Sequence, residues 1–297
     1  MKPSSNTADM TKGSPVRLIL TFSVPLIIGN IFQQFYNMVD SIVVGNFVGA
    51  NALGAVGACG SLNWLFFSLS SGLGIGIGVI VSQFYGAKRF DKVSETIANS
   101  FYVLISSALV VSILCYLIAP AVLRLLKTPD DIINDSITYM RTTCLGIVAI
   151  SLYNGVSSIL RALGDSKTPL YFLILSSICN VLLDLLFVIS FGWGVFGVAF
   201  ATILSQALSA VVSLFYAFKK ISYFHLTKKQ LKPDFLIIKN SYRLGVPIAL
   251  QSSMIAVSCV FLQSIVNSFG STVVSAYTIT NRIEQLINQP YNSIGTA

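Results

Sequence analysis

The chain has 297 residues, of which 54% are hydrophobic and only 10% are charged, and its mean hydropathy is +0.78. Soluble globular domains carry about 25% charged residues, so this composition excludes an ordinary soluble protein and indicates a protein of the lipid bilayer. The net charge of +8 does not indicate a nucleic-acid partner, because the basic residues are scattered between apolar segments. The five cysteines stand singly and only one histidine is present, so we expect neither a metal centre built on them nor another cofactor.

Eight segments are apolar enough and long enough to cross a bilayer. A hydrocarbon core of about 30 Å requires roughly 20 apolar residues per helix. The first segment is too long for a cleaved signal peptide, and no small-residue cleavage site follows it. The sequence therefore predicts an all-α polytopic membrane protein of about eight helices. The expected segments are 17–44, 54–83, 95–118, 137–160, 169–190, 195–217, 245–267 and 272–297.

Lysine and arginine residues are concentrated in alternate loops. The N-terminus and the second, fourth and sixth loops hold 15 of the 19 basic residues, and the sixth loop is the richest of them. Cytoplasmic loops carry an excess of Lys and Arg, so we expect the N-terminus and the sixth loop in the cytoplasm. The third loop carries Asp130, Asp131 and Asp135 and is expected on the outside.

The start of the seventh segment repeats the start of the first. Val24-Pro25 is echoed by Val246-Pro247, 222 residues later. The six intervening helices are an even number, so both copies would enter the membrane in the same direction, as in a parallel repeat. We therefore expect a six-helix N-lobe over residues 1–218, a Lys-rich cytoplasmic linker over 219–242, and the first two helices of an incomplete C-lobe over 243–297. The chain ends inside an apolar helix, which indicates a fragment, and a true eight-helix protein is the alternative.

Proline and glycine residues mark sites of bending and close packing in these segments. Pro25 and Pro247 leave backbone carbonyls without an amide partner, and they are the expected hinges of the first and seventh helices. Four glycines alternate along the second segment, where they allow another backbone to approach closely or the helix to bend. A nucleotide-binding role is excluded, since no soluble strand and turn surround them. These glycines are Gly72, Gly74, Gly76 and Gly78.

Few charged side chains lie at membrane depth, where each costs about 2.5–3.5 kcal/mol and is a functional candidate. With a rise of about 1.5 Å per residue, Asp40 lies roughly 6 Å and Asp184 roughly 9 Å below the outer ends of their segments. Asn180 precedes Asp184 by one turn and shares its face. Thr202 lies roughly 10 Å below the same surface on the sixth segment. Four polar side chains on three helices therefore share one depth.

These four side chains provide the chemistry of a cation site. Carboxylate, amide and hydroxyl oxygens are the ligands of hard cations, so they suit Na⁺. Two adjacent carboxylates also repel each other when both are ionised, so a proton is the alternative ligand. Either ligand, Na⁺ or a proton, implies that the function is coupled to an ion. The competing interpretation is that Asp40 and Asp184 only cap or pair with local groups near the outer interface, where water lowers the cost of burial.

Three stretches of the sequence resemble the multidrug and toxic compound extrusion (MATE) family. They are the segment from Asn37 to Gly45, the Leu-Arg-Ala-Leu-Gly-Asp-Ser-Lys-Thr-Pro turn at residues 160–169, and the segment from Ala276 to Glu284. The resemblance covers nearly the whole chain and matches the N-terminal two-thirds of such a protein. It implies a twelve-helix transporter of the bacterial inner membrane, with two six-helix lobes around a central cavity. Such a protein exports lipophilic organic cations in exchange for Na⁺ or H⁺.

The resemblance also implies roles for individual residues. The cation site of the family's N-lobe corresponds to Asp40, Asn180, Asp184 and Thr202, the same four residues that share one depth. Since four helices of the C-lobe are missing, we expect that they are needed for transport. The resemblance further implies that polar residues line the substrate cavity, and the candidates are Gln34, Tyr36, Asn37, Tyr139 and Asn154.

Three alternative functions compete with efflux. A flippase for lipid-linked saccharides would have the same architecture but a strongly cationic cavity, whereas here intramembrane acids outnumber bases. An intramembrane aspartyl protease with Asp40 and Asp184 as its dyad lacks the Gly-x-Gly-Asp signature, so we expect no enzyme. A fragment that inserts without transporting is the third alternative. The chain has no GxxxxGK[ST] motif, so the energy must come from an ion gradient or another subunit.

Overall fold

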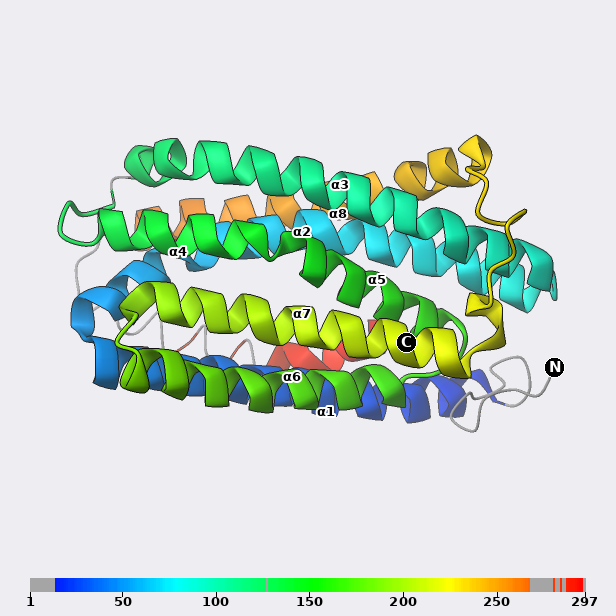
Figure 1. The fold of residues 1–297 in the computed structure, drawn as a ribbon, viewed down its shortest axis with the longest axis horizontal. Coiled ribbons are helices and arrows are strands. Elements are labelled where there is room, and N and C mark those ends of the chain that lie inside the picture. The colour runs from blue at the N-terminus through cyan, green and yellow to red at the C-terminus, as the bar shows by residue number, and fades with distance from the viewer. Residues whose placement is uncertain (1–13, 127, 268–279, 281–283, 285–286, 296–297) are drawn as a thin grey trace.

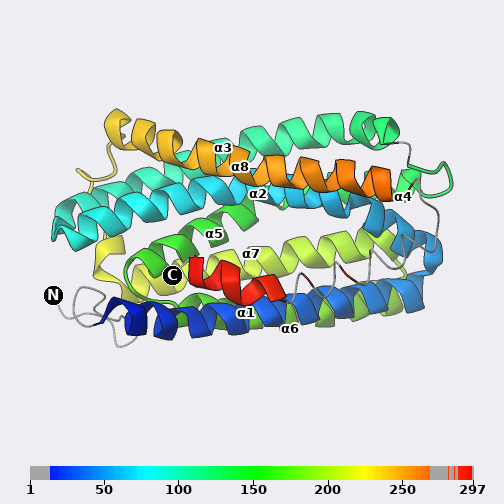
Figure 2. The ribbon, with the colours of Figure 1, turned by 180° about the vertical axis from the view of Figure 1, so that it is seen from behind.

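The computed structural model describes residues 14–126, 128–267, 280, 284 and 287–295. These residues form a bundle of long helices that run roughly along one axis (Figures 1 and 2). Two of the helices, α1 and α6, continue at their C-terminal ends as short π-helical segments, η1 and η2. In chain order the elements are α1 (Pro15–Val43), η1 (Val44–Val48), α2 (Ala50–Gly86), α3 (Phe90–Leu125), α4 (Ile133–Leu145), α5 (Ile147–Ala162), α6 (Lys167–Asp184), η2 (Leu185–Ser190), α7 (Gly194–Lys220), the 3-10 turn η3 (Ser222–Phe224) and α8 (Phe235–Asn267).

The helices agree with the multi-pass class that the sequence predicts. In the described part of the chain, five helices are long and apolar enough to cross a membrane, and a sixth is reached if α4 and α5 form one span. These correspond to the first six expected segments. Helix α8 contains the seventh expected segment, 245–267. The eighth, 272–297, lies largely outside the described residues, of which 280, 284 and 287–295 are helical.

The fourth expected segment is not one straight helix. The sequence predicts a single helix over 137–160, but α4 and α5 meet at Gly146 with a bend of 47°. A Cβ at Gly146 would lie 2.8 Å from Cγ1 of Ile203 on α7, a distance that real Cβ atoms do not show. Glycine therefore lets α7 pack into the bend, and the bend turns α5 away from the line of α4 (Figure 1).

The four alternating glycines of α2 are packing residues that serve two neighbours. Residues four apart share one face of a helix, so Gly72 and Gly76 face α8 while Gly74 and Gly78 face α5. A Cβ at Gly72 would lie only 2.5 Å from the Cα of Ala249. Atoms of α5 lie 3.4 Å and 3.3 Å from the Cβ positions of Gly74 and Gly78. The alternation thus allows α2 to pack closely between two helices, as the prediction of close backbone approach required.

The surface of the bundle is apolar and its interior carries hydroxyl groups. Large apolar side chains such as Leu117, Val211 and Phe215 are more than 60% exposed. Some buried serines donate within their own helix, as Ser205 does to the Thr202 carbonyl at 2.9 Å. Others donate to a neighbouring helix, as Ser176 does to the Ser205 carbonyl at 3.1 Å and Ser209 to the Phe172 carbonyl at 3.1 Å. Such a distribution suits lipid outside and small polar contacts between helices inside.

Buried apolar side chains form two clusters along the bundle. The first includes Val44 of η1 and Val188 of η2, each four residues beyond an aspartate of its own helix. The second lies toward the linker that joins α7 to α8 and includes Phe224, which is fully buried. The aspartates therefore lie at the edge of the first apolar cluster.

The turn between α5 and α6 is held by a buried carboxylate. Asp165 is 1% exposed, and its Oδ1 accepts hydrogen bonds from the backbone amides of Lys167 at 3.2 Å and Thr168 at 3.0 Å. The Thr168 hydroxyl donates to the other carboxylate oxygen at 2.5 Å. Gly164 has φ +88, a conformation that favours glycine. Asp165 therefore caps the start of α6, the helix that carries Asn180 and Asp184.

Candidate cation site

The two intramembrane aspartates occupy similar places near the C-terminal ends of their helices. Asp40 lies on α1 one turn before η1, and Asp184 is the last residue of α6 before η2. The two π-helical segments contact each other, and α1 packs against α6 along its length. Single π-helical turns are rare and are frequent at functional sites. The fold thus brings together two carboxylates that are 144 positions apart in the chain.

The carboxyl groups of Asp40 and Asp184 interact directly. Each carboxyl group lies close enough to affect the charge of the other, so one proton shared between them would serve both. Asp184 is completely buried, and Asp40 is partly buried. Two ionised carboxylates at this range repel each other strongly when water is excluded. A cation or a proton bound between them would relieve this repulsion.

Asn180 and Thr202 complete the group. The Asn180 amide donates to the Thr202 hydroxyl over a long 3.5 Å contact, and the hydroxyl donates to the Val198 carbonyl at 3.1 Å. Asn180 is 1% exposed. The amide nitrogen is thus turned toward α7, which leaves its carbonyl oxygen for another ligand.

Four buried oxygen atoms in this group lack a hydrogen-bond donor among the residues that the structure describes. They are Oδ1 of Asp40, Oδ1 of Asn180, and both carboxylate oxygens of Asp184. Leaving a buried acceptor unsatisfied costs about 1–3 kcal/mol, and more when the group is charged. Oxygen atoms that are clustered, buried and unpaired are the ligand set that a hard cation or a proton would take.

Two tyrosines border the aspartates. Tyr36 of α1, one turn before Asp40, interacts electrostatically with both carboxylates and contacts the Thr202 hydroxyl. Tyr139 of α4 is 7% exposed and lies near both carboxylates and near Tyr36. Both tyrosines were expected only from the resemblance, because a phenol in a helix gives no depth signal of its own.

The other expected cavity residues do not all join this cluster. Asn37 is exposed on α1, and Gln34 is half-buried on the same helix. Asn154 lies on α5, where its buried amide nitrogen has no acceptor among the described residues. Pro25 and Pro247, the expected hinges, lie inside the continuous helices α1 and α8.

The ligand set differs from that of a transition-metal site. Within the described ranges, no group of three or more His, Cys, Asp or Glu side chains is placed to hold a metal ion. The unpaired oxygens at Asp40, Asn180 and Asp184 are of the kind that binds hard cations or a proton. The π-helical segments η1 and η2 are not predicted by the sequence, because neither contains a proline or a pair of glycines that would indicate a change of helical pitch.

Comparison with protein sequences of known families supports this architecture. The MatE family matches residues 25–186. The probable multidrug resistance protein YpnP of Bacillus subtilis is 34% identical over 97% of the chain, and the multidrug export protein MepA of Staphylococcus aureus is 21% identical over 92%. The chain spans 64% of the length of the first relative and 60% of the second.

Solved structures of transporters are also similar to this chain. A multidrug resistance MATE family transporter in its outward-facing conformation superimposes with a TM-score of 0.91 at 26% identity, over 100% of this chain and 66% of the transporter. A MOP superfamily transporter from Pyrococcus furiosus gives the same values. The family match covers more than half of the chain, and the helical fold superimposes on the solved transporters over its whole length. The chain belongs to the MatE family.

Proposed function

We propose that this chain is the ion-binding part of a secondary multidrug efflux transporter. It exports lipophilic organic cations across the bacterial inner membrane in antiport with Na⁺ or H⁺. Membership in the MatE family and the similarity to proteins named for multidrug resistance support the transport role. Because the chain spans 64% of its relative's length, four further helices of a C-lobe are part of the proposal.

The proposal depends on one observation, the four unpaired oxygens at Asp40, Asn180 and Asp184. An ion or proton bound there neutralises charge that is otherwise buried without a partner. A drug cation in the N-lobe would be attracted by the same charge, and aromatic side chains such as Tyr36 would add cation–π contact. Binding of the ion and binding of the drug are therefore mutually exclusive, as antiport of ion and drug requires.

Ion binding is coupled to helix shape through α1 in this proposal. Pro25 lacks an amide hydrogen, so the carbonyl one turn earlier has no helical donor and α1 bends more easily there. When Asp40 and Asp184 lose their mutual repulsion, the outer part of α1 moves toward α6 and the cavity closes on the outer side. Pro247 provides the corresponding bend in α8.

The arrangement in the membrane follows from charge. The lysine-rich linker and the N-terminus face the cytoplasm, because cytoplasmic loops carry the excess of Lys and Arg. Residues 1–218 form the N-lobe, 219–242 include the linker, and 243–297 open the C-lobe. Helix α7 ends at Lys220 and α8 begins at Phe235, so the last part of the proposed linker is the first part of α8.

Ethidium retention in efflux-deficient bacterial cells tests the proposal. We compare this chain, its Asp40→Asn variant, and both sequences extended with the remaining part of a relative's C-lobe. We expect efflux from the extended chain and its loss in the extended variant, with equal membrane insertion of both. Efflux by the short chain alone would mean that the missing helices are not needed. Full efflux by the extended Asp40→Asn variant would overturn the proposed ion coupling.

A further inference from the structure

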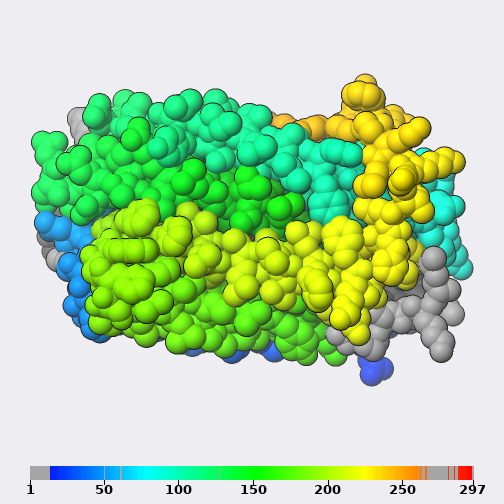
Figure 3. All heavy atoms as spheres, in the orientation of Figure 1, coloured from blue at the N-terminus to red at the C-terminus, as the bar shows by residue number. Residues whose placement is uncertain are grey.

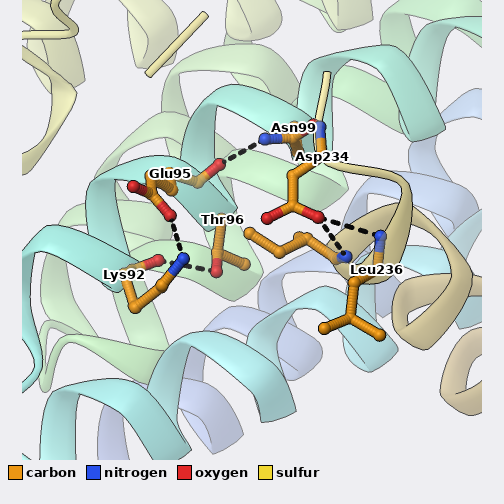
Figure 4. Close-up of polar contacts among 7 residues, drawn as sticks. Lys92, Glu95, Thr96, Asn99, Asp234 and Leu236 are labelled. Atoms are coloured by element: carbon orange, nitrogen blue, oxygen red, sulfur yellow. Dashed lines mark hydrogen bonds and ion pairs between the residues drawn. The ribbon is translucent and has the colours of Figure 1, made fainter. Parts of the chain in front are cut away.

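The linker between α7 and α8 is fixed to α3 by side-chain hydrogen bonds (Figure 4). The Asp234 amide donates to Oδ1 of Asn99 at 2.8 Å, and the Asn99 amide nitrogen donates to the Glu95 carbonyl at 2.9 Å. The Asp234 carboxylate accepts from the amides of Leu236 at 2.9 Å and Ile237 at 3.4 Å, so it caps the start of α8. Asn99 therefore joins the end of the linker to α3.

Two further contacts hold the linker against the bundle. The Tyr102 hydroxyl of α3 donates to the Leu231 carbonyl at 2.8 Å. Phe224 is fully buried, and its ring lies 5.7 Å from that of Phe218 and 6.5 Å from that of Phe101. The linker is thus a fixed part of the surface, and Figure 3 shows it crossing one end of the molecule from α7 to α8.

This fixed segment is strongly basic. Residues 219–239 contain six lysines and one acidic residue, Asp234, whose carboxylate is already used as a helix cap. On the neighbouring α3, Glu95 is paired with Lys92. All six lysines are exposed, and none of them forms an ion pair with an acid among the residues that the structure describes. The lysines are Lys219, Lys220, Lys228, Lys229, Lys232 and Lys239.

Large apolar side chains are exposed among these lysines. Phe235 is 82% exposed, Leu236 67% and Leu231 44%, and all three lie within the basic stretch. Single exposed apolar residues are common on water-facing surfaces, but a cluster of large ones marks a contact surface. Lysines around bare apolar side chains are instead typical of segments that lie in the headgroup region of a membrane.

We propose that residues 219–239 form a binding surface for anionic phospholipids, in which the lysines bind headgroup phosphates and Leu231, Phe235 and Leu236 enter the boundary with the acyl chains. The surface lies where the apolar helix α7 ends, which is the level of the headgroups. Juxtamembrane clusters of four to eight basic residues bind anionic lipid, with about a five-fold gain in binding per residue. Because Asn99 and Tyr102 fix the backbone, the surface is preformed.

The chemistry favours lipid over a soluble acidic partner. A nucleic acid or an acidic peptide would pair with the lysines but would leave Phe235 and Leu236 exposed to water. Lysine carries a compact charge on a flexible stem, which allows it to reach headgroups at several depths. A bound anionic lipid would therefore hold the start of α8 at the membrane surface, independently of any ion at Asp40 and Asp184.

Tryptophan fluorescence in nanodiscs tests this proposal. The two native tryptophans are replaced by Trp64→Phe and Trp193→Phe, and Phe235→Trp supplies a single reporter. The discs contain phosphatidylcholine with or without phosphatidylglycerol, and either lipid carries bromine on its acyl chains as the quencher. We expect brominated phosphatidylglycerol to quench the reporter at least two-fold more than brominated phosphatidylcholine at equal content.

Lysine variants identify the source of this preference. The triple variant Lys228→Gln, Lys229→Gln, Lys232→Gln should lose the preference for phosphatidylglycerol. A control that removes three charges elsewhere should keep it. Equal quenching by both lipids would overturn the preference for anionic lipid. No quenching by either lipid would overturn the proposal entirely and indicate that protein covers this surface. The control substitutions are Arg17→Gln, Lys88→Gln and Lys167→Gln, all at exposed residues.

Discussion

Gly76 of α2 and Gly245 of α8 bring two helix backbones into direct contact. A Cβ at Gly76 would lie 2.6 Å from the backbone nitrogen of Gly245, and a Cβ at Gly245 would lie 2.8 Å from the Cα of Leu73. Nearby, the hydroxyls of Ser68 and Ser253 are 3.2 Å apart, so the same interface also has a polar contact. The first helix after the linker is therefore packed tightly on the second helix of the chain.

Substitution of Gly76 should loosen this interface. Gly76→Ala places a methyl group against backbone that cannot yield, and overpacking of this kind costs about 1–3 kcal/mol. We expect a lower unfolding temperature of the purified protein in detergent. Gly60→Ala on the same helix is the matched control, since a Cβ there meets nothing within 4 Å. Equal melting of the two variants would show that the contact does not contribute to stability.

The paired aspartates should make stability depend on the coupling ion. A ligand that binds only the folded protein adds about 2.7 kcal/mol at 100 times its Kd. We expect Na⁺ or acid to raise the unfolding temperature of the wild-type chain. Asp184→Asn should be more stable than wild type without the ion, because it removes one of two repelling charges, and should lose the ion-dependent increase.

Asp130→Asn is the control for this experiment, because Asp130 is exposed and far from the pair in sequence. It removes the same charge and should retain the full ion-dependent increase. If Asp184→Asn kept the ion-dependent increase in unfolding temperature, the buried carboxylates would not be the ion-binding site. Comparison of Na⁺ at constant pH with acid at constant Na⁺ distinguishes the two ions.

Thr202 should contribute to ion affinity through Asn180. Thr202→Val keeps the shape of the side chain but removes the hydroxyl that accepts from the Asn180 amide at 3.5 Å. One neutral hydrogen bond contributes about 0.5–1.5 kcal/mol, so we expect the apparent Kd to rise about two- to ten-fold. Thr138→Val, at an exposed hydroxyl that donates to the Asn134 carbonyl, is the control. Equal apparent Kd values for the ion in Thr202→Val and Thr138→Val would contradict this role.

Asp165 should stabilise α6 from its first turn. Asp165→Ala removes the acceptor of two backbone amides, and the loss of such a cap costs about 0.5–2 kcal/mol. Asp165→Asn keeps one acceptor oxygen and should cost less. The unfolding temperature measures both, with Asp91→Ala as an exposed acidic control in the first turn of α3. A smaller loss for Asp165→Ala than for Asp165→Asn would contradict the capping role.

The bend at Gly146 and the pitch changes at η1 and η2 could not be read from the sequence. Hydropathy gives the same signal for a straight span and for one bent by 47°, since both bury the same apolar length. The bend exists because Ile203 of α7 occupies the space that a side chain at Gly146 would need. Likewise, η1 and η2 form where α1 and α6 pack together, and no residue within them requires a π-helix.

The class of the protein and the expected depth of its polar residues follow from the sequence alone. Apolar length sets the number of membrane-crossing helices, lysine distribution favours one orientation, and helical rise places Asp40, Asp184 and Thr202 at one level. Only the tertiary structure decided which of these side chains meet, because depth fixes one coordinate and packing fixes the other two. It brought Asp40 to Asp184 and left Asn37 exposed on the surface, although both residues lie in the same turn of α1.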